Sequence, residues 1–274
     1  MNDLFINRGT QAPLDYRLHN ETYGIASWFG LEPAAEEDLS KKKTKSAQSS
    51  VNPSNKIPFA AELDDLIRLH FLCLNRRVTT VLEFGVGKST RVFAEAMRIN
   101  ENLHGDYVKK HLRRGDAFRV FSVDNAPKWV GHCKQELPEE LRSLVNFTIT
   151  DVEMTTFNGR ICTAYGQLPN ICPDLIYVDG PGQFGIKGEV RGISTAAKDR
   201  LPMSADVLLL EPFLLPGTLI VLDGRTANAR FLKHNLQGKW VYHEFPGMDL
   251  NTFELKEAPL GRINRAQLAY CLGR

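Results

Sequence analysis

The hydrophobic positions after residue 57 alternate between helical spacing and strand spacing. A first helix, ending near Arg76, is predicted by four apolar residues that recur three or four positions apart: Leu63, Ile67, Phe71 and Leu74. The β-rich apolar run 78–84 follows, and Gly85 and Gly87 interrupt it. A second helix can begin at Ser89 or Thr90, so this unit predicts a strand, a glycine turn and a helix.

The alternation of strands and helices continues toward the C-terminus. Further strands are predicted at 118–123, 145–150, 175–178 and 218–222. Helices are predicted at 128–144, with a break at Pro138, and at 207–214 and 227–236. Late strands are predicted at 240–245, 252–255 and 267–272 with no long helix between them. We therefore expect an α/β fold: a doubly wound, mostly parallel sheet with an antiparallel edge.

Three segments depart from this regular pattern. Residues 1–56 join an aromatic stretch, with Tyr23, Trp28 and Phe29 as packing candidates, to a polar linker, so we expect an N-terminal segment at 1–56 and an α/β domain at 57–274. Residues 99–117 look like an insertion rich in basic side chains, and residues 182–201 like one rich in glycine and charge.

Composition places the chain among ordinary globular proteins and excludes several classes. Of the 274 residues, 43% are hydrophobic and 24% charged, and the balance of 34 basic against 32 acidic residues argues against a dedicated nucleic-acid binder. No apolar run is long enough for a membrane span, and the first residues lack the pattern of a secretory signal. The five cysteines are scattered, which disfavours a disulfide framework or zinc site and predicts a reducing, cytoplasmic location.

Four of the predicted strands end in an acidic residue: Asp124, Asp151, Asp179 and Asp223. In open α/β sheets, ligands bind beyond the carboxyl ends of the strands. Aspartate is also common in turns, which would explain any one of these residues. Four acids at one edge, together with Glu83 beside the glycine turn, favour a functional cleft.

The glycine turn is compatible with two nucleotide-binding motifs, each incompletely. Gly87, Lys88 and Ser89 match the end of a P-loop, but Leu82 stands where that motif requires its first glycine. Gly85 and Gly87 match the start of a dinucleotide fingerprint, but Thr90 stands in place of its third glycine. An ATP- or NAD-binding Rossmann-like enzyme therefore remains an alternative.

The pattern E-x-G-x-G after the first strand, with an acid at the end of the second, resembles class I S-adenosylmethionine-dependent methyltransferases over about residues 78–245. The resemblance implies S-adenosylmethionine as cofactor and methyl transfer to a hydroxyl of a small molecule or a sugar. A non-catalytic module that retains the fold as a scaffold is the alternative from another class. The methyltransferase resemblance also implies which residues bind the cofactor. The methionine part would lie against Glu83, Phe84, Gly85 and Gly87, the ribose against Asp124, and the adenine against Asp151 and Val152.

The same resemblance places Asp179 opposite the transferable methyl group. Asp179 and Asp223 end strands expected to be neighbours, so they are the candidate catalytic pair, acting through a proton or through a divalent cation between them. Related metal-assisted enzymes often carry a histidine where Pro181 stands, so the third metal ligand stays open. Asp223 can alternatively cap the helix that begins near Thr226.

Overall fold

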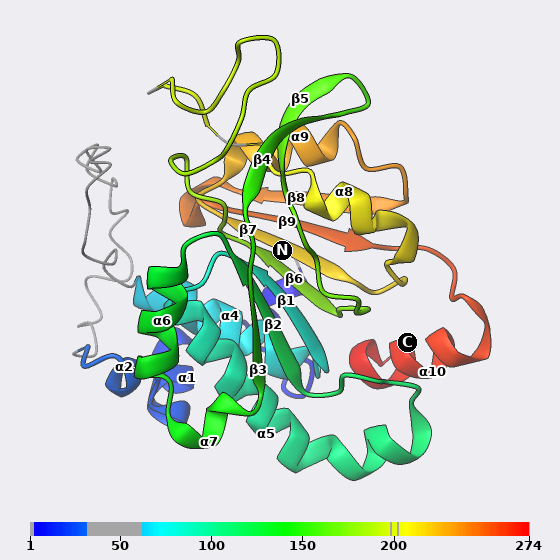
Figure 1. Cartoon of the computed structure of the whole chain (residues 1–274). Helices are drawn as coiled ribbons and strands as arrows, with labels where there is room; N and C mark the ends of the chain where they lie inside the picture. Colours follow the sequence, from blue (N-terminus) through cyan, green and yellow to red (C-terminus); the bar gives the residue numbers. More distant parts are fainter. Residues whose placement is uncertain (1–2, 32–61, 198, 202, 274) are drawn as a thin grey trace.

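The computed structural model describes residues 3–31, 62–197, 199–201 and 203–273. A seven-stranded sheet forms its centre, in the order β3-β2-β1-β6-β7-β9-β8 (Figure 1). The strands of this sheet are β1 (Thr80–Phe84), β2 (Arg119–Asp124), β3 (Val145–Ile149), β6 (Leu175–Val178), β7 (Leu219–Asp223), β8 (Trp240–Phe245) and β9 (Leu250–Leu255).

The strand directions confirm the predicted doubly wound, mostly parallel sheet. The five strands β3, β2, β1, β6 and β7 pair in parallel. The antiparallel pairs lie on the far side of β7, where β9 pairs with both β7 and β8. The reversed strand is thus β9, and β8 at the very edge again runs in the direction of β7.

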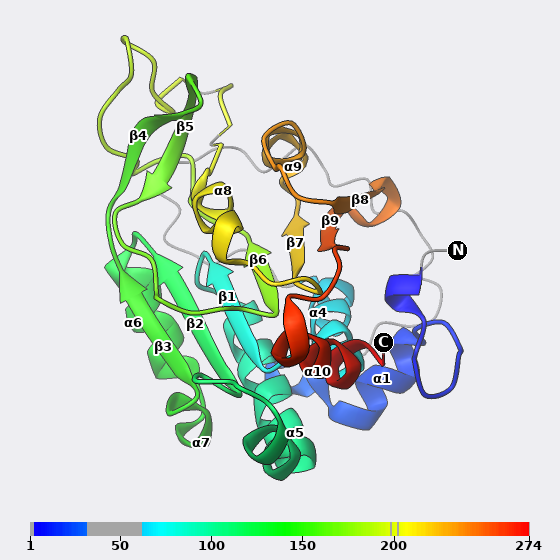
Figure 2. The same cartoon turned by 90° about the vertical axis from the view of Figure 1, so that its right-hand side faces the viewer.

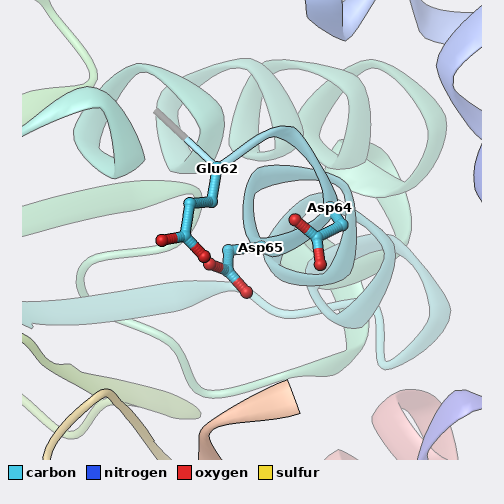
Figure 3. A group of neighbouring side chains, drawn as sticks. All are labelled: Glu62, Asp64 and Asp65. Carbon is cyan, nitrogen blue, oxygen red and sulfur yellow. The ribbon is translucent and has the colours of Figure 1, made fainter. Parts of the chain in front are cut away.

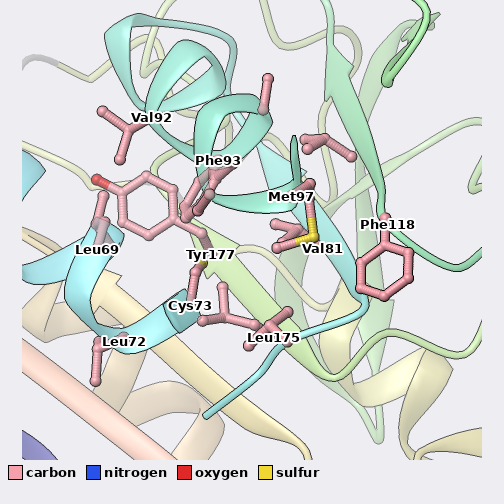
Figure 4. Packing of buried hydrophobic residues seen from close by; sticks show 14 of the residues in the cluster. Leu69, Leu72, Cys73, Val81, Val92, Phe93, Met97, Phe118, Leu175 and Tyr177 are labelled. Carbon is pink, nitrogen blue, oxygen red and sulfur yellow. The ribbon is translucent and has the colours of Figure 1, made fainter. Parts of the chain in front are cut away.

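Alternate residues of the central strands supply two separate cores. On β6, Leu175 and Tyr177 belong to one buried cluster, whereas Ile176 and Val178 belong to the other. Figure 4 shows the first cluster, where Tyr177 meets side chains of the helices that follow and precede β1. A parallel sheet whose strands are apolar on both faces needs other elements packed against both faces, and this chain has elements on each.

Different elements cover the two faces (Figures 1 and 2). The first face carries α4 (Leu63–Asn75), α5 (Lys88–His111), α6 (Pro127–Glu136), α7 (Glu139–Arg142) and α10 (Gly261–Leu272). The second face carries α8 (Asp206–Leu210), α9 (Thr226–Lys233) and a hairpin of β4 (Val152–Phe157) and β5 (Arg160–Tyr165). Short 3₁₀ helices are η1 (Asp3–Phe5), η2 (Glu211–Phe213) and η3 (Pro246–Met248).

The N-terminal helices α1 (Tyr16–Tyr23) and α2 (Ile25–Trp28) pack against α4, as expected for the aromatic stretch. His19 and His70 share a hydrogen bond of 2.9 Å, and Tyr23 and Trp28 pack against the His70 ring. Burial lowers the pKa of His70 to about 3 and that of His19 to about 4, so this contact holds two neutral imidazoles. The expected boundary between residues 56 and 57 lies outside the described residues.

Two predictions of secondary structure were wrong. Residues 267–272, predicted as a strand, are the end of helix α10. Their alternation of apolar residues also fits a helical face, because Asn264, Gln267, Leu268 and Cys271 are buried at helical spacing. Residues 99–117, predicted as an insertion, are largely a continuation of α5, which extends to His111.

The hairpin β4–β5 replaces the helix expected in a crossover between the parallel strands β3 and β6. It turns at Asn158 and Gly159, whose φ angles of 48° and 73° both lie in the left-handed region. Asn-Gly between alternating residues is the strongest short-range signal for a hairpin, so the sequence contained this information. Figure 1 shows β4 continuing the path of β3 beyond the end of the sheet.

Candidate active site

The residue pairs of the parallel strands bring the strand ends to one edge, the carboxyl edge. Phe84 at the end of β1 pairs with Val123 of β2 and Val178 of β6, and Val178 pairs with Leu222 of β7. The residues that follow these strand ends, Gly85, Asp124, Asp179 and Asp223, therefore lie along the same edge. Of the four acids predicted at the strand ends, the register places Asp124, Asp179 and Asp223 at this edge, whereas Asp151 lies past the end of β3, directly before β4. Their functional roles stay predictions.

The glycine turn after β1 packs directly against the backbone after β6. Gly85 has a φ of +94°, and a Cβ built on it would lie 2.8 Å from the carbonyl carbon of Asp179 and from the nitrogen of Gly180. A Cβ on Gly180 would in turn lie 2.7 Å from the nitrogen of Gly85. The two glycines therefore permit a backbone contact that any side chain would block. Gly85 thus serves the turn itself, whether or not a ligand approaches.

Glu83 lies beneath this turn and is fully buried. Its carboxylate accepts hydrogen bonds from the hydroxyls of Ser89 (2.5 Å), Thr90 (2.6 Å) and Ser122 (2.6 Å). Burial raises the pKa of Glu83 to about 7, although the three hydroxyl bonds act in the opposite direction. These contacts give Glu83 a role in joining β1, β2 and the start of α5. Its contact with the cofactor stays a prediction.

Asp124 fixes the turn from the neighbouring strand. Its Oδ2 accepts a hydrogen bond from the backbone N–H of Val86 at 2.8 Å, and its Oδ1 accepts one from Ala126 at 2.7 Å. Burial raises the pKa of Asp124, and the backbone bonds oppose that shift. Each carboxylate oxygen has a second lone pair, so these contacts leave capacity for a further donor.

Asp151 and Val152 lie where β3 passes into the hairpin. Asp151 is exposed and forms an ion pair of 2.6 Å with the Nζ of Lys187. The Val152 carbonyl accepts a hydrogen bond from the backbone N–H of Lys187 at 2.8 Å, while its side chain is buried in the second core. The segment around Lys187 therefore lies beside the position that the resemblance gives to adenine.

Asp179 is joined to the end of β7 by Arg225, a residue that the sequence reading left out. The Arg225 Nε lies 3.5 Å from the Oδ1 of Asp179, and its Nη1 donates to the carbonyl of Pro181 at 3.0 Å. Its Nη2 donates to the carbonyl of Asp179. The N-cap residue of α9 is Arg225, two residues after Asp223, so Asp223 does not occupy the capping position that was expected as its alternative role.

A divalent cation between Asp179 and Asp223 does not fit these side chains. A guanidinium already lies against the Asp179 carboxylate, and Pro181 and Gly224 offer no side-chain ligand. Within the described ranges, the group of three carboxylates close enough to share a metal is instead Glu62, Asp64 and Asp65 at the start of α4 (Figure 3).

Arg68 lies against that acidic group and supplies its positive charge. Its Nη1 donates to Asp64 at 3.0 Å, and its Nη2 contacts Asp65. The group at the start of α4 therefore has a cation of its own.

Tyr165 at the end of β5 is a second residue that the sequence reading missed. Its hydroxyl would lie 2.5 Å from a Cβ on Gly180, and its ring stacks on Phe84 with centroids 5.5 Å apart. The hydroxyl is buried and has no hydrogen-bond partner among the described residues. Recognition of the Asn-Gly hairpin would have brought this strand, and with it Tyr165, to the carboxyl edge.

The structure excludes the P-loop alternative. Leu82, which stands at the position of the motif's first glycine, is a fully buried strand residue of β1 rather than part of a loop. Thr90 bonds both to Glu83 and to the N–H of Gly87, whose distance to the threonine oxygen is 3.2 Å. The turn is therefore short and is closed by a threonine side chain.

Comparison with known proteins gives solved structures but no sequence relatives. No family model and no curated protein matches the sequence. The O-methyltransferase TomG from Streptomyces achromogenes, in complex with SAM, is 14% identical, with 87% of this chain and 99% of that chain covered and a TM-score of 0.43. The O-methyltransferase from Bacillus cereus, in complex with SAH, is 13% identical, with 88% and 100% covered and a TM-score of 0.44. A methyltransferase from Geobacter sulfurreducens is 15% identical, with 89% and 98% covered and a TM-score of 0.45.

The contact between Gly85 and the backbone after β6 predicts a large loss of stability for Gly85→Ala. The new Cβ strains a left-handed residue and meets backbone atoms, which together should lower the free energy of unfolding by about 2–4 kcal/mol. Gly182→Ala is the matched control, because its Cβ would meet no atom within 4 Å. Urea denaturation of both variants tests this, and equal stability would contradict the packing.

The buried carboxyl of Glu83 predicts a dependence of stability on pH. Its pKa rises from 4.5 to about 7 on folding, so between these values the folded protein holds a proton that the unfolded chain has lost. Stability should therefore fall as the pH rises through this window, by at most about 1.4 kcal/mol per pH unit, and then level off. Glu83→Gln should remove this component when the unfolding free energies of both proteins are compared from pH 4.5 to pH 8. Parallel curves for the two proteins would show that Glu83 does not titrate in this window.

Proposed function

We propose that this protein is an S-adenosylmethionine-dependent methyltransferase that methylates a hydroxyl group of a small molecule. The observation that carries the proposal is the bond from Val86 of the glycine turn to the carboxylate of Asp124. It joins the two elements of the family pattern, the turn after the first strand and the acid after the second, into one rigid surface at the carboxyl edge. The strand order, with the reversed strand β9 beside β7, supports the same family.

The chain's residues have to bind the cofactor, orient the acceptor hydroxyl and accept its proton. Bound S-adenosylmethionine would supply a methyl group already activated by its sulfonium charge. Asp124 can accept a hydrogen bond from a ribose hydroxyl through its remaining lone pairs. Alignment of the acceptor hydroxyl with the methyl group is then the main contribution to the rate.

Asp179 is the proposed acceptor of the hydroxyl proton. About 55% of its side chain is exposed, so it can contact a substrate, and Arg225 holds its carboxylate in place. Asp223, at the end of the neighbouring strand, is proposed to act with it. Because the guanidinium lies where a cation would bind, the proposed reaction uses no divalent metal.

The proposed location is the cytoplasm. All five cysteines are free thiols, and four of them are buried. Such thiols persist in a reducing compartment. Among the described residues, no helix has both the length and the apolar character needed to cross a bilayer.

Calorimetry with S-adenosylhomocysteine and with ATP tests the cofactor. We expect saturable binding of S-adenosylhomocysteine and none of magnesium-ATP, because the turn is too short for a phosphate-wrapping loop. In Asp124→Ala the affinity should fall by roughly ten- to a hundredfold, since a charged acceptor is worth about 1.5–3 kcal/mol. Thermal unfolding of the unliganded variant separates this loss from a weakened fold. Binding of ATP alone would refute the proposal.

The proposed proton transfer predicts that the enzyme is insensitive to chelators. Incubation with EDTA should leave methyl transfer unchanged, and added magnesium should not increase it. Asp179→Asn should slow turnover by roughly a hundredfold or more, as expected for loss of a general base, without weakening the binding of S-adenosylhomocysteine. Full activity in an Asp179→Asn, Asp223→Asn double variant would show that neither residue takes part in the reaction. Loss of activity in EDTA that added magnesium restores would show that a divalent cation is used in place of proton transfer to Asp179.

A further inference from the structure

A cavity of about 550 Å³ lies between the hairpin and the segment that follows β6. It is open to solvent, and its volume falls in the range of roughly 300–1,000 Å³ that is usual for small-molecule sites. The residues that form most of its wall are Met154, Ile161, Cys162, Thr163, Met203 and Ala227.

Hydrogen bonds hold the walls of this cavity in fixed positions. The N–H of Thr163 on β5 donates to the carbonyl of Met203 at 2.8 Å, and the N–H of Ala205 donates to the carbonyl of Thr163 at 2.9 Å. Ser204 and the side chain of Asn228 on α9 exchange two bonds of 3.1 Å. The hairpin, the segment before α8 and the start of α9 thus form one frame around the cavity.

The cavity adjoins the row of acids at the carboxyl edge. Ala227 in its wall follows Asp223 by four residues, so their Cα atoms are at most about 14 Å apart. Arg225, between them in the sequence, contacts Asp179. The short segment from Arg225 to Ala227 therefore joins the cavity wall to the Asp179 contact.

The wall has the chemistry of a site for an apolar molecule. Apolar side chains form the larger part of it, and Thr163, Thr195, Asp199 and Arg200 also line it. The Thr163 hydroxyl is buried and has no hydrogen-bond partner among the described residues. A sugar would lose the hydration of several hydroxyls in such a place, and each unpaired polar group would cost free energy.

We propose that this cavity binds the methyl acceptor and that the acceptor is an apolar, ring-containing molecule with a hydroxyl group. The inference rests on the proposed methyltransferase function for the identity of the ligand as a substrate. It assigns acceptor specificity to the hairpin β4–β5, the element that replaces a crossover helix in this chain.

Fluorescence titration with 4-methylumbelliferone, an apolar phenol of two fused rings, tests this assignment on the full chain. The wild-type protein with saturating S-adenosylhomocysteine should bind the probe saturably. Ile161→Trp fills the cavity and should lower the affinity for the probe by at least about tenfold, which corresponds to about 1.4 kcal/mol, while S-adenosylhomocysteine still binds. Leu103→Trp is the matched control, because Leu103 is 69% exposed on α5 and lies outside the cavity wall.

A second variant guards against misfolding. Met154→Trp fills the same cavity from β4 and should give the same loss of the probe. Unchanged affinity in either folded variant, absence of saturable phenol binding by the wild type, or preferential binding of methyl glucoside would overturn the proposal. The wild type could instead bind the phenol, sensitively to Ile161→Trp, but not S-adenosylhomocysteine. That result would refute the methyltransferase function and leave the cavity as a ligand site.

Discussion

The close approach of two backbone segments is the constraint on which the candidate site depends. Gly85 after β1 and Gly180 after β6 face each other without side chains, and a Cβ on either would meet backbone of the other segment at under 3 Å. This contact fixes the glycine turn relative to Asp179, and therefore the proposed cofactor surface relative to the proposed proton acceptor. A reaction that needs alignment of two molecules benefits from such a fixed distance.

Two carboxylates hold the turn in this place, and each uses a different kind of donor. Glu83 takes three hydroxyl donors from below, whereas Asp124 takes backbone N–H groups from the side. Buried acids without such donors would destabilise the fold, so the hydroxyls of Ser89, Thr90 and Ser122 are as necessary as the acids. The motif of this turn therefore includes these small hydroxyl residues as well as its acids and glycines.

The hairpin β4–β5 makes the second major difference to the site. A helix in this crossover would only cover the sheet, but the hairpin continues beyond the end of β3 and brings Tyr165 to Gly180. It also forms a wall of the cavity beside α9. One local change of secondary structure thus packs Tyr165 against Gly180 and supplies a wall of the candidate acceptor site.

The alternation of strands and helices, the parallel sheet and the row of acids at its edge could be predicted before folding was considered, because they follow from local periodicity and from the direction of parallel strands. The amino-acid sequence also contained the hairpin, in Asn158 and Gly159, and it left residues 267–272 open to two periodicities. No local pattern shows that Arg225 lies against Asp179, that Ser122 encloses Glu83 together with Ser89 and Thr90, or that Gly85 meets Gly180. The contacts of Ser122 with Glu83, of Arg225 with Asp179 and of Gly85 with Gly180 join residues from 39 to 95 positions apart, and such pairs depend on how whole elements pack rather than on any local pattern.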